Sequence, residues 1–319
     1  MDSGTVSDRL SAGPRALIRS PWFRLTVVVI VLAAWGWFLF RQLDTLRSYG
    51  WQINPAAFGG AIALGALYFA GLAVCWTMLL RTFGDAARAV SLPAGAGIWL
   101  GTMLSRYVPG NVWHILGRLA FAGQLGVSRT HVLASATVEQ VLTLLGALSV
   151  FGLSLPFWRG GDDTLWLLLM IPIGLVLLHP RVLGTALSWA AERLRRPELA
   201  WNYRYGELLG VLLAYALANT VAGLALIVVI AGLGAPNIPL APLIGAANLA
   251  WVLGYLSFLT PSGLGVREAA LTALLAAFVP LPVAIVAGLV HRLALTMGEL
   301  LAAGIALWFT RLQNLHPHS

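Results

Sequence analysis

Apolar residues run along most of this chain in stretches long enough to cross a membrane, and short polar segments separate them. A hydrocarbon core of ~30 Å takes about 20 consecutive apolar residues in a helix. Windows near this length occur at 25–40, 57–80, 132–156, 164–179, 208–232 and 282–309. The pattern therefore predicts an all-α polytopic membrane protein with about six full transmembrane helices.

Two further apolar segments depart from this pattern because each contains a break. The segment 92–125 is interrupted at Pro109-Gly110, and the segment 240–279 at Pro261-Ser262-Gly263. Proline removes a backbone donor and disfavours helix in the preceding residue, while glycine permits a sharp turn. The runs after the breaks, 111–125 and 266–279, are too short to cross the hydrocarbon, since the second reaches only about 21 Å. Each segment predicts two half-helices in a re-entrant or broken-helix hairpin.

A full helix with a polar stripe follows each hairpin. Glu139 lies 30 residues after Pro109, and His291 lies 30 residues after Pro261. The polar positions share one helix face in each case: Ser135, Glu139 and Thr143 in the first helix, and Arg292, Thr296 and Glu299 in the second. Three full spans separate the hairpins, so the second hairpin enters the membrane from the opposite side. We predict an inverted repeat, with repeat 1 at about 92–156 and repeat 2 at about 240–309.

Composition supports the membrane class. The chain is 59% hydrophobic and only 10% charged, with a mean hydropathy of +0.83, outside the range of soluble chains. With alternating spans, 14 of the 20 arginines fall on the side of the N-terminus, and only Arg41, Arg47 and Arg159 fall opposite. The positive-inside rule then places both termini in the cytoplasm. We expect a multi-pass protein of the cell (inner) membrane, with a cytoplasmic tail at 1–24, a single integral membrane domain at 25–310 and a second cytoplasmic tail at 311–319.

Several kinds of chemistry are disfavoured. Cys75 is the single cysteine and lies inside the second span, so the sequence predicts no intrachain disulfide and no metal cluster. A net charge of +8 spread over a membrane protein does not indicate nucleic acid. We therefore expect no cofactor, no metal and no nucleic-acid partner.

The two breaks predict a polar site. Backbone groups freed inside the membrane must be buried in protein or line a wet cavity, and half-helix N-termini favour anions. Arg106, Arg267 and Arg292 would add positive charge and bidentate donors suited to phosphate. Glu139, Glu268 and Glu299 would pair with these arginines. The candidate substrate-binding residues are Arg106, Pro109, Gly110, Asn111, Arg118, Glu139, Pro261, Ser262, Gly263, Gly265, Arg267, Glu268, His291, Arg292 and Glu299.

Structural interpretations stand beside these functional ones. Arg106 and Arg118 would fit a position near a surface, with their charged ends reaching water. Glu139 and Arg292 lie deeper in their helices and would also fit a purely structural ion pair. His291, like His114, would fit a hydrogen-bonded core histidine.

A family resemblance rests on these motifs. Arg106 with Pro109-Gly110, then Gly126-Val127-Ser128 and Glu139, then Pro261-Ser-Gly-Leu-Gly-Val-Arg-Glu268 and the helix with His291-Arg292 resemble the lysylphosphatidylglycerol synthase transmembrane-region family. This family is also called the flippase domain of the multiple peptide resistance factor. The resemblance covers roughly residues 25–310 and implies movement of lipids between leaflets. Full-length members add a soluble aminoacyltransferase domain, so the expectation here is lipid translocation without aminoacylation. Gln140 departs from the family pattern, which has an arginine after the glutamate.

The leading hypothesis is therefore a lipid flippase or transporter, and not an enzyme. Its substrate would be a phospholipid, an aminoacyl-phospholipid or a polyprenyl-phosphate-linked sugar, held by its anionic head group in a polar cavity between the hairpins. A homo-oligomer and a separate lipid-modifying enzyme remain open as partners. The alternatives are an intramembrane hydrolase or transferase that uses Ser262 as nucleophile and His291 as base, and an accessory membrane subunit whose hairpins are structural.

Overall fold

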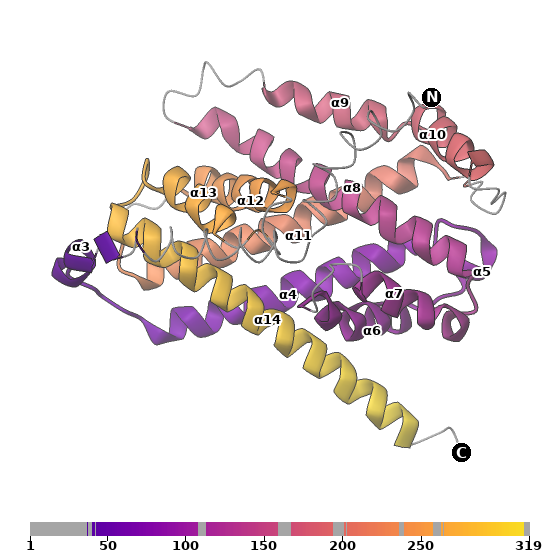
Figure 1. The fold of residues 1–319 in the computed structure, drawn as a ribbon, viewed down its shortest axis with the longest axis horizontal. Coiled ribbons are helices and arrows are strands. Elements are labelled where there is room, and N and C mark those ends of the chain that lie inside the picture. The colour runs from indigo at the N-terminus through magenta and orange to yellow at the C-terminus, as the bar shows by residue number, and fades with distance from the viewer. Residues whose placement is uncertain are drawn as a thin grey trace, which may run out of the picture.

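The computed structural model describes residues 37, 40–41, 43–107, 113–158, 167–193, 201, 203–235, 239–257, 263 and 265–315. Every regular element in these ranges is helical (Figure 1). The elements are α3 (Leu43–Ser48), α4 (Pro55–Leu80), α5 (Asp85–Arg88), α6 (Leu92–Met103), η1 (Leu104–Tyr107), α7 (Trp113–Ala120), η2 (Ala122–Leu125), α8 (Arg129–Ser154), η3 (Leu155–Phe157), α9 (Met170–Leu177), α10 (Pro180–Arg193), α11 (Tyr205–Gly232), α12 (Leu240–Leu256), α13 (Val266–Leu275) and α14 (Leu281–Leu315).

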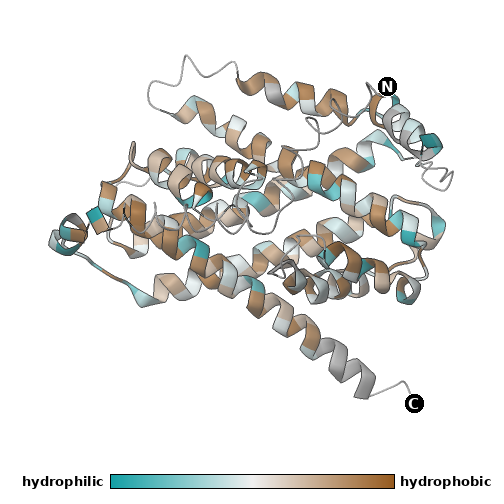
Figure 2. Cartoon of the chain, viewed as in Figure 1, coloured by the Kyte–Doolittle hydropathy of each residue, from teal (hydrophilic) through white to brown (hydrophobic). Residues whose placement is uncertain are grey.

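Four helices in the described part of the chain are long and apolar enough to cross a membrane: Pro55–Leu80, Arg129–Phe157, Tyr205–Gly232 and Leu281–Trp308. Hydrophobic residues recur along these helices (Figure 2). These four agree with four of the six predicted spans and identify the chain as membrane-embedded. The predicted span 25–40 lies almost entirely outside the described residues. In the predicted span 164–179 the described part is a turn at 167–169 and the eight-residue helix α9, which is shorter than a crossing needs.

The helices α4 and α11 pack side by side in opposite directions at the centre of the bundle. The amide of Asn54, which caps α4, donates to the carbonyl of Gly232 at the end of α11, at 2.8 Å. Near the other end, the indole Nε1 of Trp201 donates to the carbonyl of Thr82, at 3.1 Å. The start of each helix therefore lies beside the end of the other.

The two pairs of short helices enter the bundle from opposite ends. The pair α6–α7 follows the end of α4, and the pair α12–α13 follows the end of α11, so the antiparallel packing separates them along the bundle (Figure 1). The helices α6 and α7 have 12 and 8 residues, and α12 and α13 have 17 and 10. The prediction that both segments are divided into short helices is confirmed, while the breaks at 108–112 and 258–262 lie outside the described residues.

A pair of glycines brings α14 against α4. A Cβ added at Gly298 would lie 2.5 Å from the backbone nitrogen of Ala66 and 2.6 Å from the carbonyl carbon of Gly65. Backbone atoms cannot move aside as the end of a side chain can. The two helices therefore touch through their main chains at this point, and any larger residue would separate them.

Gly298→Val should lower the free energy of unfolding by about 1–3 kcal/mol or more, because overpacking here must push α14 away from α4. Gly304→Val is the matched control, since a Cβ at Gly304, on the same helix, meets nothing within 4 Å. The measurement is the unfolding midpoint of each purified variant in detergent. Equal midpoints for the two variants would contradict the close contact.

Candidate functional site

The first ion pair joins α7 to α8 inside the protein. Arg118 of α7 donates through Nη1 to Oε2 of Glu139 in α8, and the side chains are only 1% and 4% exposed. The indole Nε1 of Trp99 donates to the other carboxylate oxygen at 2.6 Å. The guanidinium carbon of Arg118 lies 5.0 Å from the ring centroid of Trp76 and 5.2 Å from that of Trp99. The pair is therefore buried, with its guanidinium over two aromatic rings, which favour a cation over their faces.

This geometry corrects two sequence interpretations. Arg118 does not reach a surface, because its side chain is buried; the surface interpretation is wrong. Glu139 pairs with Arg118, whereas the sequence predicted Arg106, Arg267 and Arg292 as the partners of the glutamates. The available signal was spacing: His114 and Arg118 are four residues apart on the amphipathic helix α7, and both are buried. Gln140, where the family pattern has an arginine, accepts a hydrogen bond from the Tyr255 hydroxyl at 3.0 Å and so links α8 to α12.

The second ion pair joins α13 to α14 and is more open. Arg292 of α14 donates through Nη1 to Oε1 of Glu268 in α13, one of the three glutamates that the sequence offered as partners of the arginines. The side chain of Glu268 is 6% exposed, but that of Arg292 is 26% exposed. The other oxygen of Glu268 accepts from the amide of Gly265 at 2.8 Å. The carboxylate therefore occupies the positive N-terminal end of α13, where the sequence predicted an anion.

Two glycines before α13, Gly263 and Gly265, have special backbone conformations. Gly263 and Gly265 have φ of +65° and +82°, a conformation that side chains other than glycine disfavour. A Cβ added at Gly263 would lie 2.6 Å from the carbonyl oxygen of Gly254 in α12. The prediction that these glycines take special conformations or close contacts is confirmed at Gly263 and Gly265, while Gly110 lies outside the described residues.

Gly263→Val should therefore impair folding, because the strained backbone alone costs about 1–3 kcal/mol and the clash with Gly254 adds to this. Gly101→Val is the control: a Cβ at Gly101 meets only the flexible end of Leu307, at 3.8 Å. The yield of monodisperse protein and its melting midpoint in detergent measure the difference. Equal yields and midpoints would show that the backbone before α13 does not need glycine.

A polar recess lies beside the second ion pair, among α4, α11, α12, α13 and α14. It contains about 230 Å³ of space between atoms, a volume that includes space open to the surroundings, and its polar lining includes Arg267, His291, Asn219 and Asn248. The amide of Asn219 donates to the Thr143 carbonyl, and the amide of Asn248 to the Asn219 carbonyl, each at 3.3 Å. These contacts connect α8, α11 and α12. Sequence reasoning missed both asparagines, although single amides inside apolar spans are a recognisable signal of helix contacts.

The remaining candidates divide by position. Glu299 is fully buried in α14. Arg106 lies in η1, with its side chain outside the described part of the chain. The described residues do not include Pro109, Gly110, Asn111, Pro261 and Ser262. Within the described residues, no hydrogen bond or ion pair joins the first pair to the second. The described residues therefore present two ion pairs between helices, one joining α7 to α8 and one joining α13 to α14.

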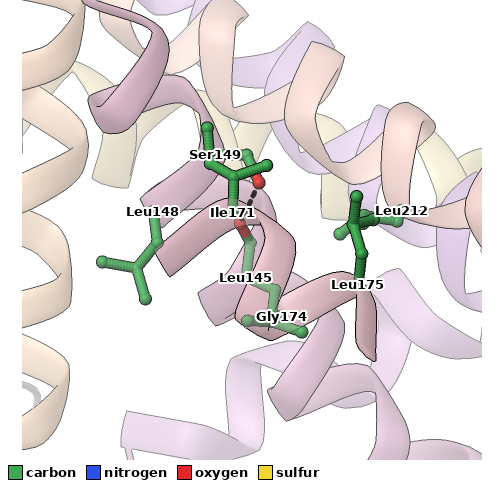
Figure 3. Close-up of a pocket in the computed structure, with 7 residues that line it drawn as sticks. All are labelled: Leu145, Leu148, Ser149, Ile171, Gly174, Leu175 and Leu212. Atoms are coloured by element: carbon green, nitrogen blue, oxygen red, sulfur yellow. Dashed lines mark hydrogen bonds between the residues drawn. The ribbon is translucent and has the colours of Figure 1, made fainter. Parts of the chain in front are cut away.

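A second recess, between α8, α9 and α11, is lined almost entirely by aliphatic side chains (Figure 3). Its one polar lining side chain, Ser149, donates its hydroxyl to the carbonyl of Leu145 at 2.7 Å. None of the side chains that line this recess is charged. Of the two recesses, only the one beside α13 and α14 has a charged lining side chain, Arg267.

The chain matches no protein-family model, and no curated protein matches it. Among the described residues, no group of three or more His, Cys, Asp or Glu could hold a metal ion.

Proposed function

We propose that this protein moves lipids with anionic head groups between the leaflets of a membrane. The observation that carries the proposal is the Arg292–Glu268 pair, which lies at the start of a broken helix within an apolar bundle and leaves Arg292 partly exposed. A charged side chain inside a membrane protein is costly, and such residues usually mark the path of a substrate or ion.

The contacts of Glu268 suggest how a phosphate would bind. Its two oxygens accept one hydrogen bond from a guanidinium and one from a backbone amide, that of Gly265. A head-group phosphate offers the same arrangement of anionic oxygens, and arginine binds phosphate well. In the proposed cycle the phosphate replaces the Glu268 carboxylate on Arg292, while the acyl chains remain in lipid.

The arrangement of the two units supports alternating exposure to the two leaflets. In each unit an ion pair joins a short helix to a long one: α7 to α8 in the first unit, and α13 to α14 in the second. The short helices of the two units enter from opposite ends of the bundle. The order of charge is reversed: the short helix carries the arginine in the first unit and the glutamate in the second. Inverted repeats with broken helices are typical of secondary transporters, so we retain the inverted repeat as part of the proposal. The resemblance to the lysylphosphatidylglycerol synthase transmembrane-region family, the cell membrane location and the cytoplasmic termini stay predictions.

The enzyme alternative has less support. The Nε2 of His291 lies 2.9 Å from the Ala222 carbonyl, and the imidazole is 1% exposed, so this nitrogen is already engaged. Ser262, its proposed nucleophile, lies outside the described residues. The contact with the Ala222 carbonyl occupies Nε2 of His291.

The test is lipid movement in reconstituted vesicles. The purified chain is placed in phosphatidylcholine vesicles with fluorescent phosphatidylglycerol or fluorescent phosphatidylcholine, and a membrane-impermeant reductant reports how fast inner-leaflet label reaches the outside. We expect fast movement of phosphatidylglycerol and slower movement of phosphatidylcholine. Rates equal to those of protein-free vesicles would overturn the proposal and favour the accessory-subunit alternative.

A further inference from the structure

His291 combines deep burial with an unpartnered ring nitrogen. Because Nε2 faces the Ala222 carbonyl at 2.9 Å, Nε2 must carry the hydrogen, and Nδ1 is left as an acceptor in the neutral ring. Nδ1 has no hydrogen-bond partner among the described residues. Buried polar atoms normally have partners, so an exception of this kind points to a bound species.

The recess beside His291 provides room for that species. Its lining brings together the imidazole, the side chains of Asn219 and Asn248, and Arg267. A water molecule needs a polar site with several hydrogen-bonding groups, and this recess supplies them. Water in the recess would give Nδ1 a donor and a route by which a proton can arrive.

The charges around the imidazole decide when it can hold a proton. The recess presents Tyr68 from α4 and Arg267 from α13, and its lining from α11 and α12 is not titratable. The helix α6, which also packs on α14, carries no titratable residue. Glu268 on α13 is neutralised by Arg292, and Glu299 lies two turns further along α14. Arg267 therefore opposes a charged imidazole in the structure described here, and an added anion near Arg267 and Arg292 would remove that opposition.

We propose that His291 is a proton-binding site that couples proton movement to lipid movement. A proton from water in the recess bonds to Nδ1 when the head-group phosphate is bound, giving an imidazolium that the phosphate balances. The same proton later leaves Nδ1 for water on the opposite side of the membrane, as the phosphate is released. One proton then travels with each monoanionic head group. This inference rests on the proposed function and adds the coupling ion to it.

The experiment uses the full chain in phosphatidylcholine vesicles that contain phosphatidylglycerol as a minor component, with the membrane voltage held at zero. With one proton per lipid, a gradient of about one pH unit should shift the steady-state ratio of phosphatidylglycerol between the leaflets up to about tenfold. A pH-sensitive dye inside the vesicles should report proton movement that depends on phosphatidylglycerol. Lipid movement that equilibrates the leaflets regardless of the gradient overturns the inference and leaves the proposed function standing. No lipid movement in any gradient overturns both.

A substitution assigns the effect to His291. His291→Gln keeps a side-chain N–H that can donate to the Ala222 carbonyl but cannot take up a proton at pH 5–8. We expect this variant to move phosphatidylglycerol more slowly and without any response to the gradient, while the control His179→Gln, at the end of α9, keeps the response. An unchanged response in His291→Gln overturns the assignment. If His291→Gln fails to fold, the wild-type dye signal still decides, because an absence of lipid-dependent proton movement overturns the inference.

Discussion

Glu139→Gln should lower the free energy of unfolding by about 3–5 kcal/mol, because it leaves the Arg118 guanidinium charged and buried without its counter-charge. The site cannot compensate easily. Arg118 is 1% exposed, and its Nε has no partner among the described residues. Denaturant unfolding of purified protein in mixed micelles, followed by tryptophan fluorescence, measures the loss. Trp76 and Trp99 lie against the pair and should report its disruption.

Two further variants make this expectation specific. Replacing both partners, as Arg118→Met with Glu139→Leu, should recover most of the stability, since an apolar pair of similar volume leaves no isolated charge. Asp85→Asn is the control, because the Asp85–Arg88 pair is exposed and 3.9 Å long and should contribute less than about 1 kcal/mol. A Glu139→Gln variant no less stable than Asp85→Asn would show that Arg118 is solvated, contrary to the burial described above.

The second large effect is functional and concerns Arg292. Arg292→Gln should slow the movement of phosphatidylglycerol by about 10- to 100-fold, since a hydrogen bond to a charged group contributes about 1.5–3 kcal/mol. The variant should fold, because Arg292 is partly exposed and the Glu268 carboxylate keeps its bond to the Gly265 amide. Arg292→Lys should recover part of the rate, since a point charge cannot reproduce a bidentate contact. Initial rates are compared at equal protein incorporation.

Arg204→Gln is the matched control for this loss. Arg204 lies just before α11 and is exposed. Its replacement by glutamine removes the same charge from the chain as Arg292→Gln does. Its variant should move lipid at the wild-type rate. If Arg292→Gln also moved lipid at that rate, Arg292 would have no role in the head-group site, and the structural ion-pair interpretation would replace the one proposed.

Sequence patterns predicted the elements that local physics determines. The long apolar windows gave the four long helices, and the proline and glycine positions gave the division into short helices. The sequence offered Glu268 among three glutamates and Arg292 among three arginines, and the structure shows that these two pair. The burial of Arg118 did not follow, because it depends on the packing of Trp76 and Trp99, which come from two other helices, α4 and α6. The hydropathy of the sequence shows only that Arg118 is a charged residue in a short apolar segment. It does not show which aromatic rings pack against the side chain.

Helix α14 has a consequence for the membrane around the protein. Its 35 residues extend about 52 Å. Its apolar part, Leu281–Trp308, extends about 42 Å and exceeds a hydrocarbon thickness of ~30 Å. The C-terminal part projects past the other helices (Figure 1), with Leu301, Ile305 and Trp308 exposed. The mismatch must be absorbed by tilting this helix or thickening the adjacent bilayer. Arg292 and His291 lie on the same helix, so the depth of both side chains depends on bilayer thickness, and membranes of different lipid chain length should set them at different depths.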